Sequence, residues 1–417
     1  MEKSTYKIHI IGAGISGLIA AQILENYGYK PTIIEASSTV GGRVKSDNFE
    51  GYTLDRGFQV LLTSYPAAKK YLDYDALELQ PFLPGATIFK NGKSQTIGDP
   101  IRNLSLLVPT LFSSIGNFSD KIKILKLNAL LKKKKIATIF KAKEITTLEY
   151  LKEFGFSVQI IEDFFTPFFS GIFLEPNLET SSRMFEFVYK MFGDGLAVLP
   201  KHGIQEIPNQ LKRKLKNTNF KFDSLVSEVK DKSVIFEDGT TLKSDITIIA
   251  TDANSLISNL KNQETNWNSC DTLYFEAKNR IINKPLIGLI ADKNSLVNNI
   301  FYHTSVTAPK KANTELLSVT IVKNHQLNEK ELLEKVVEEL YHKCAITNLT
   351  FLKRYQIKKA LPKLTNLQYE ISSTETKLKS TIFLAGDQLL NGSLNAAMIS
   401  GERAALGVVQ AIDESSK

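Results

Sequence analysis

Cysteine is nearly missing from this chain, which has only Cys270 and Cys344 among its 417 residues. Two widely separated cysteines predict neither a disulfide framework nor a cysteine-rich metal site, and we predict no metal site of any kind. Long apolar runs are also missing, because no stretch reaches the roughly 18 apolar residues that a membrane-spanning helix needs. The first predicted strand begins at Lys7, so we expect no signal peptide and a cytoplasmic protein.

Acidic residues are too few to balance the basic ones, and the formal net charge is +8 with a pI near 9.1. An excess of basic residues is common in nucleic-acid-binding proteins, but here aromatic residues do not alternate with the lysines and no nucleic-acid-binding motif occurs. We therefore predict no nucleic-acid partner. The hydrophobic content of 43% is that of an ordinary globular protein. The length suits two domains, which can be interleaved along the chain.

A glycine-rich loop, GAGISG, stands near the start of the chain. Gly12, Gly14 and Gly17 follow an apolar run that predicts a buried strand over residues 7–11 and precede a helical pattern over residues 16–27. The first glycine permits a tight turn, the second lets a ligand approach the backbone, and the third lets helix and strand pack closely. Unpaired amides at the helix start then face a diphosphate. The spacing predicts a dinucleotide site; the alternative is a plain strand–helix–strand unit with a glycine-rich turn.

Further residues narrow the choice of dinucleotide. A second strand, residues 30–36, carries Glu35 near its end, at the spacing where an acid binds ribose hydroxyls. A second glycine pair and Arg43 follow in the sequence GGR, and this guanidinium can reach the diphosphate from the other side. A nicotinamide dehydrogenase has no particular need of that element. Gly57 then lies in a strand-like stretch, residues 51–66, where a backbone has to pass a flat ring.

These motifs resemble those of the flavin-containing amine oxidase superfamily, which includes protoporphyrinogen oxidases and phytoene desaturases. The resemblance rests on GAGISGL, Glu35, GGR and the D-x-G of residues 55–57, together with residues 381–405, which are similar to the second FAD signature of that superfamily. It implies that the turn at Gly386-Asp387 meets the ribityl-diphosphate. It also implies a helix from about residue 393 whose N-terminus faces the N1/O2 edge of the flavin.

The resemblance implies that the cofactor is FAD, bound non-covalently because no cysteine lies in the second signature. In the family, the valine at Val226 brackets the adenine, and the turn at Thr251 lies near the diphosphate. The predicted cofactor-binding residues are Gly12, Gly14, Ile15, Ser16, Gly17, Glu35, Ala36, Gly42, Arg43, Val44, Gly57, Phe58, Gln59, Val226, Thr251, Gly386, Asp387, Ser393, Leu394, Asn395 and Ala397.

The fold implied by the resemblance is α/β, with a Rossmann-like FAD-binding domain of the glutathione-reductase type and an interleaved α+β substrate domain. We expect the FAD-binding domain to be discontinuous, over residues 1–75, 200–260 and 375–417. The substrate domain then comprises residues 76–199 and 261–374.

Phenylalanine is concentrated between residues 154 and 192, which hold ten of the 24 in the chain. Such a concentration indicates a hydrophobic core, with an apolar tunnel over the flavin as the alternative. No acidic cluster suited to a cationic amine accompanies these rings. A lipid-like, isoprenoid or tetrapyrrole substrate is therefore favoured over an amine.

Residues 120–143 hold nine lysines and a single acidic residue, Asp120, with leucines and isoleucines between them. The pattern predicts a basic helix whose face is either solvated or interfacial, with lysines toward anionic head groups and leucines toward acyl chains. The apolar stretch of residues 104–118 precedes it. Peripheral contact with a membrane surface is the sharper of these two interpretations.

Together these features predict an FAD-dependent oxidoreductase of desaturase, oxidase or isomerase type. It would move a hydride from an apolar substrate to flavin N5 and pass electrons to O2 or a quinone. The alternatives are a soluble amine oxidase that releases hydrogen peroxide and a non-catalytic, membrane-associated flavoprotein.

No nucleophile or acid–base pair stands out in the sequence. None is required, because the flavin performs the hydride transfer and the protein supplies orientation and electrostatics. Amine oxidases often have an aromatic cage near residues 355–364, but here only Tyr355 is aromatic and Trp267 lies elsewhere in the sequence. The candidates for polar help in catalysis are His202, His303, Tyr355 and Lys358, with Lys201 and Tyr302 beside the two histidines.

Overall fold

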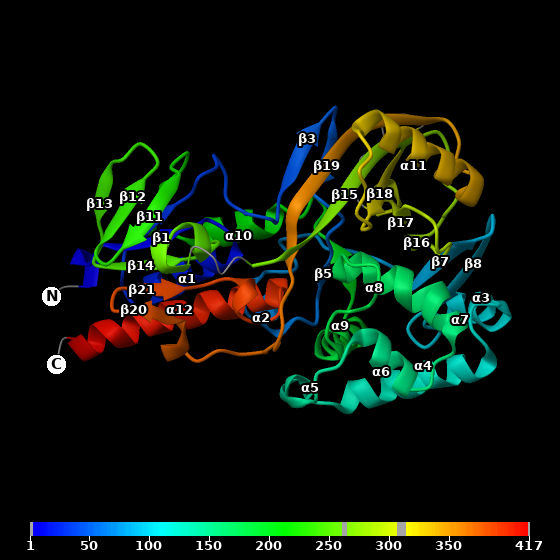
Figure 1. The fold of residues 1–417 in the computed structure, drawn as a ribbon, viewed down its shortest axis with the longest axis horizontal. Helices are drawn as coiled ribbons and strands as arrows, with labels where there is room; N and C mark the ends of the chain where they lie inside the picture. Colours follow the sequence, from blue (N-terminus) through cyan, green and yellow to red (C-terminus); the bar gives the residue numbers. More distant parts are fainter. Residues whose placement is uncertain (1–2, 261–264, 307–313, 416–417) are drawn as a thin grey trace.

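The computed structural model describes residues 3–260, 265–306 and 314–415. Its elements form two connected units (Figure 1), one around a six-stranded sheet and the other around a seven-stranded sheet with a layer of helices. Because helices pack on the mostly parallel first sheet, the α/β fold expected from the sequence is confirmed.

The first sheet has the strand order β10-β2-β1-β14-β21-β20, parallel throughout except for antiparallel β20 at the edge. The apolar sequence IHII forms β1 in its centre, where Ile10 pairs with Ile33 on one side and Ile248 on the other. The strands are β1 (Ile8–Ile11), β2 (Thr32–Ile34), β10 (Asn219–Lys221), β14 (Ile246–Ile249), β20 (Lys377–Lys379) and β21 (Ile382–Leu384).

Two layers cover this sheet, and strand alternation assigns residues to each. Ile10 belongs to the core shared with α1 (Ile15–Asn26), α10 (Glu206–Lys214) and α12 (Leu394–Ser415). Its neighbour Ile11 packs instead against a small antiparallel sheet. That sheet is formed by β11 (Val226–Lys230), β12 (Ser233–Phe236) and β13 (Thr241–Lys243).

The second unit is built on a sheet in the order β19-β15-β18-β17-β16-β7-β8, and α11 (Glu329–Cys344) packs on one face of it. Its longest strands, β15 and β19, extend toward the first unit (Figure 1). The strands are β7 (Gly85–Lys90), β8 (Lys93–Gly98), β15 (Trp267–Ala277), β16 (Ile287–Ile290), β17 (Val297–Tyr302), β18 (Glu315–Ile321) and β19 (Leu349–Pro362).

A group of helices completes the second unit, and short elements join the two units. The helices are α3 (Leu107–Phe112), α4 (Phe118–Lys133), α5 (Ile136–Lys141), α6 (Thr147–Glu153), α7 (Val158–Ile160), α8 (Thr166–Phe173) and α9 (Ser182–Asp194). The joining elements are the hairpin β3 (Ser46–Phe49) and β4 (Tyr52–Asp55), the strands β5 (Leu61–Leu62), β6 (Gln80–Pro81) and β9 (Ala197–Leu199), and α2 (Pro66–Tyr71). The domain boundaries themselves stay a prediction.

The basic helix expected over residues 120–143 is divided into two helices, α4 and α5. Lys190 explains where α4 ends, because its ammonium donates to the carbonyls of Leu131 and Lys132 at 3.0 Å each. Lys134 adopts an extended conformation and its ammonium pairs with Glu186 at 2.5 Å. Contacts from a distant helix thus override the local lysine pattern. Among the described helices, none is both long and apolar enough to cross a bilayer.

Candidate active site

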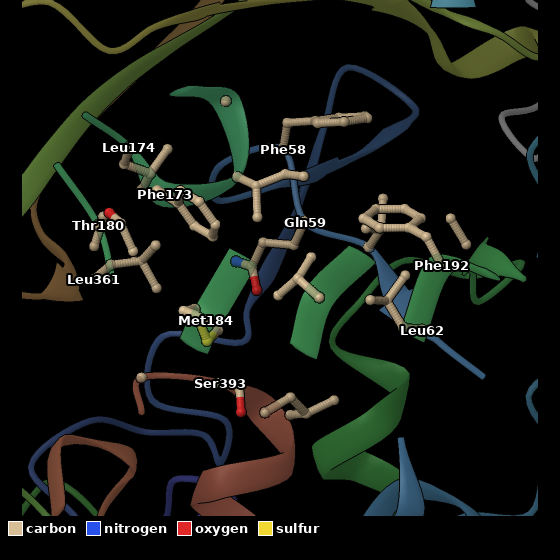
Figure 2. A pocket seen from close by; sticks show the side chains of 18 of the residues that line it. Phe58, Gln59, Leu62, Phe173, Leu174, Thr180, Met184, Phe192, Leu361 and Ser393 are labelled. Carbon is tan, nitrogen blue, oxygen red and sulfur yellow. The ribbon is translucent and has the colours of Figure 1, made fainter. Parts of the chain in front are cut away.

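A cavity of about 1140 Å³ extends from the β1–α1 loop, past the start of α12, to α3 and α4. Figure 2 shows side chains from several separate segments around this space, including Gln59, Met184 and Ser393. Both predicted FAD signatures and the phenylalanine-rich helices therefore face one volume, with the glycine-rich loop at one end.

The N-terminus of α1 offers backbone donors at that end of the cavity. Its N-cap, Gly14, is extended and makes no side-chain capping bond, and the first backbone bond of the helix runs from Leu18 N–H to the Gly14 carbonyl at 3.0 Å. A Cβ on Gly17 would lie 2.1 Å from the Gly12 carbonyl oxygen, so this position admits only glycine. A Cβ on Gly42 would lie 3.3 Å from the Gly14 Cα. Such a bare, positively polarised cradle fits a diphosphate.

Glu35 is fixed at the carboxyl end of β2. One oxygen of its carboxylate accepts the Ala13 N–H at 2.7 Å, and the other accepts the Ser37 N–H at 2.9 Å and the Ser37 hydroxyl at 2.7 Å. These bonds hold the carboxylate beside the glycine-rich loop, where it lines the cavity. An acid in this position fits the ribose of a dinucleotide.

Arg43 joins the first signature to the second. Its guanidinium forms an ion pair with the buried carboxylate of Asp387, donates to the Ala360 carbonyl at 3.2 Å and lies 5.2 Å from the ring centre of Trp267. Because Arg43 and Asp387 lie more than 300 residues apart and both line the cavity, their pairing fixes the relative position of the two halves of the cofactor site.

The start of α12 provides a second helix N-terminus. The Ser393 hydroxyl accepts the Ala396 N–H at 3.0 Å and donates to the Asn391 side chain at 2.7 Å. The helix that follows is 22 residues long, so its dipole places partial positive charge at the cavity. This terminus fits the electron-rich edge of a flavin.

Most predicted cofactor-binding residues line this one cavity. Asn395 anchors the chain instead, because its side-chain oxygen accepts the Ala67 N–H at 2.9 Å. Val226 is buried in the core between the two sheets of the first unit. The predicted residues outside the lining are Gly17, Ala36, Val226 and Asn395.

The two candidate histidines lie away from the cavity lining. His202 is exposed, and its ring nitrogen lies 3.8 Å from the Glu78 carboxylate. His303 is buried and shares a 2.9 Å hydrogen bond with the Ser318 hydroxyl. Burial lowers the pKa of His303 to about 4, so its ring is neutral at ordinary pH. Neither histidine belongs to the lining of the cavity.

The other candidates also lie outside the lining. The Tyr355 hydroxyl donates to Asp47 at 2.8 Å, and burial together with this carboxylate raises the pKa of the phenol. Lys358 and Lys359 are both exposed on β19, but of the two only Lys359 lines the cavity, where it pairs with Asp252 at 2.9 Å. Strand alternation accounts for this difference of one residue.

Lys201 and Tyr302 contribute to structure in the same way. The Lys201 ammonium pairs with Glu78 at 2.5 Å on the surface, and Tyr302 is buried in the core of the seven-stranded sheet. By contrast, Trp267 does line the cavity, although no sequence motif predicts it there. The pairing of Trp267 in β15 with Pro362 in β19 brings its ring to the site.

The phenylalanine-rich segment serves both as core and as cavity wall. Phe165 and Phe169 are fully buried, while Phe164 and Phe168 lie on the other side of the same helical stretch and line the cavity. Phe164 and Phe168 stack with ring centres 5.4 Å apart. Figure 2 shows Phe173 and Phe192 in the same cavity. One face of this segment therefore belongs to the hydrophobic core and the other face lines the cavity.

Comparison with known proteins identifies the family of this chain. A family model described as flavin containing amine oxidoreductase matches residues 15–409. A stretch of 76 residues, 18% of this chain, is 38% identical to an L-amino-acid oxidase from Sistrurus catenatus edwardsii, of which it covers only 15%.

Two solved structures show the same fold over nearly the whole chain. A protein described as a protoporphyrinogen oxidase from Exiguobacterium sp. 255-15 is 16% identical with a TM-score of 0.68, over 99% of this chain and 100% of that chain. The fatty acid isomerase from P. acnes that produces CLA is 15% identical with a TM-score of 0.70, over 96% of this chain and 98% of that chain. At this identity the likeness concerns the fold alone. The family match spans most of the chain, so the protein belongs to the flavin-containing amine oxidoreductase family and is an FAD-dependent oxidoreductase.

Proposed function

We propose that the enzyme acts on an apolar substrate of lipid, isoprenoid or tetrapyrrole type, as a desaturase, oxidase or isomerase. The observation that carries this proposal is the aromatic wall of the cavity beyond the start of α12, formed by Phe164, Phe168, Phe173 and Phe192. Walls of this kind hold hydrocarbon surface away from water. FAD, when bound, takes up the hydride that a substrate C–H bond releases.

The chain itself orients the substrate and keeps the site dry. Phe58, which lines the cavity, packs against Phe82 and Phe301 at ring-centre distances of 6.1 and 5.3 Å. The amide of Gln59 donates to the Arg43 and Arg56 carbonyls at 3.0 Å each, which fixes its direction. A rigid apolar surround of this sort excludes water from the reacting atoms.

The carboxylates of the cavity argue against a cationic amine. The buried Glu175 accepts the Asn177 N–H at 2.8 Å, the Thr180 N–H at 3.1 Å and the Thr180 hydroxyl at 3.0 Å. Both of its oxygens are thus engaged by its own loop. Two further carboxylates of the lining, Asp99 and Glu179, are half-buried and exposed, respectively, so water reaches them. An ammonium group would lose its hydration there without a partner.

The test is a product analysis with the purified holoenzyme. Linoleic acid, phytoene and protoporphyrinogen represent the apolar classes, and putrescine and L-leucine represent the amines. We expect mass spectrometry to detect loss or migration of hydrogen in at least one apolar compound. Release of hydrogen peroxide and ammonia from the amines, with every apolar compound unchanged, would favour the amine oxidase alternative.

The electron acceptor follows from the same proposal. A desaturase or oxidase has to discharge the two electrons it gains, and we propose O2 or a quinone as the acceptor, whereas an isomerase would return the hydride to its product. Comparing turnover in air, under argon and under argon with a soluble quinone separates these cases. Turnover that persists under argon without any acceptor identifies an isomerase.

A further inference from the structure

Large apolar side chains are exposed together on α3, the turn before it and the first half of α4. Phe112 is 84% exposed, Leu104 80%, Ile101 79% and Phe118 75%. Single exposed apolar residues are common on protein surfaces, but a group of them in one place marks an interaction surface. The ammonium of Lys121 in α4 donates to the Leu111 and Ser113 carbonyls at 3.1 and 2.9 Å, so the two helices adjoin. We name this surface the apolar rim and define it by Ile101, Leu104, Val108, Phe112, Phe118 and Ile122.

The apolar rim adjoins a mouth of the cavity, which we define by Leu111 and Leu125. Leu111 and Leu125 are both exposed to solvent, at 56% and 47%, and both line the cavity. Arg102 and Asn128 line it from the same segment. Figure 1 places α3 and α4 at the end of the molecule remote from both chain termini and from the first sheet. The cavity therefore extends from the cofactor end to an apolar surface.

The segment that carries the rim has an excess of basic over acidic residues. Between residues 101 and 135 the only acidic residue is Asp120, which is buried and accepts the Ser157 N–H and hydroxyl at 2.9 and 2.6 Å. The exposed cations of this segment are Arg102, Lys126, Lys132, Lys133 and Lys135. A second copy of the chain placed against this surface would bring like charges together. An anionic bilayer would meet both the apolar and the basic groups.

We propose that the apolar rim docks on the surface of an anionic membrane, with its apolar side chains at the acyl boundary and its lysines at the lipid head groups. Apolar substrate then passes from the bilayer through the mouth at Leu111 and Leu125 without crossing water. The part of this inference that concerns substrate entry rests on the proposed function, which assigns an apolar substrate. The proposed docking is supported independently by the exposed apolar side chains of the rim and by the basic residues of the same segment.

The test is flotation of the FAD-loaded full chain with vesicles of phosphatidylcholine alone or mixed with phosphatidylglycerol. We expect binding to the anionic vesicles, weakened by salt. The pair Lys126→Gln and Lys133→Gln should reduce affinity by about 25-fold, since each lysine near an anionic surface contributes about fivefold. The double substitution Leu104→Ser and Phe112→Ser should reduce vesicle affinity at least tenfold, on whichever of the two vesicle types binds the unaltered protein.

Matched controls lie on α11, which Figure 1 shows apart from α3 and α4. Tyr341 is 55% exposed and Lys330 carries an 85% exposed side chain, so Tyr341→Ser and Lys330→Gln remove the same kinds of group elsewhere. These variants should bind vesicles as the unaltered protein does. Circular dichroism and the FAD absorbance of every variant show that it is folded and loaded.

The outcomes separate docking from catalysis. Docking is overturned if anionic vesicles do not bind the protein, or if the rim variants bind as well as the α11 controls. Self-association in free solution that Phe112→Ser abolishes would also overturn it, in favour of a dimer. A protein that floats with vesicles but converts no apolar compound retains the docking surface and loses the proposed substrate class.

Discussion

The guanidinium of Arg43 and the carboxylate of Asp387 form an ion pair that connects the N-terminal and C-terminal cofactor segments. The carboxylate is buried, with a side-chain exposure of 6%, whereas the guanidinium is 40% exposed toward the cavity. Because only Arg43 partners this carboxylate among the ion pairs of the described chain, its removal leaves a buried negative charge beside the site for a diphosphate.

Arg43→Ala should therefore weaken FAD binding by about thirtyfold, the equivalent of about 2 kcal/mol for an unpaired buried charge. Arg213→Ala removes a comparable arginine from an exposed pair with Glu206 at 3.2 Å and serves as the control. Titration of apoprotein with FAD, followed by flavin fluorescence, measures both. Equal affinities for the two variants would exclude a role of Arg43 in cofactor binding.

Gly17→Ala should abolish FAD binding and lower the free energy of unfolding by about 2 kcal/mol or more, because the new Cβ would meet the Gly12 carbonyl at 2.1 Å. Gly193→Ala is the matched substitution, since a Cβ there meets nothing within 4 Å. It lies in α9 and should change stability by no more than about 1 kcal/mol. Urea unfolding of both variants decides whether helix–strand contact fixes the choice of glycine at position 17.

His303 should make stability fall in acid. Its pKa is about 4 in the folded state, against 6.5 in the unfolded state. A histidine with a lowered folded pKa stabilises fully above pH 6.5 and loses that contribution as the pH falls toward 4. Relative to His303→Gln, which can still hydrogen-bond Ser318, the protein should lose about 3 kcal/mol between pH 7 and pH 4.

The measurement is the difference between the two unfolding free energies at each pH. Taking this difference cancels the contribution of Asp55, whose pKa burial raises to about 6 and which acts in the opposite direction. It likewise cancels His9, whose pKa burial lowers to about 4. Parallel curves for the protein and His303→Gln would show that His303 is not buried in its neutral form.

Phe168→Asn should weaken binding of an apolar ligand about tenfold by replacing an aromatic wall residue of the cavity with a polar amide. The fluorescent fatty acid cis-parinaric acid is the probe. Phe351→Asn perturbs a partly buried ring that packs on Phe275 at 5.8 Å outside the cavity lining, and should leave probe affinity unchanged. A reduction common to both variants would point to general loss of structure.

The cofactor end of the cavity was predictable because local sequence dictates it. Gly17 is required by a contact within one strand–turn–helix unit, because a Cβ there would lie 2.1 Å from the Gly12 carbonyl oxygen, and Gly12 has a φ of +105° that favours glycine. Glu35 follows from the length of that unit. The positions of Gly17 and Glu35 could therefore be predicted without knowing which distant segments contact them.

The remaining parts of the site depend on tertiary contacts that the sequence does not display. Trp267 pairs with Pro362 across two long strands, and this pairing of distant segments brings it to the cavity. Lys359 rather than Lys358 faces the cavity because of the register of β19. The end of α4 is set by Lys190, which lies almost 60 residues later in the chain.

Anaerobic titration of the purified protein, followed by the visible absorption of its flavin, tests the assignment of an apolar substrate most directly. We expect acid precipitation to release the yellow colour into the supernatant, because FAD is bound non-covalently. We further expect linoleic acid, phytoene or protoporphyrinogen to bleach the flavin in the native protein, while putrescine and L-leucine do not. Bleaching by the amines alone would contradict the assignment of an apolar substrate.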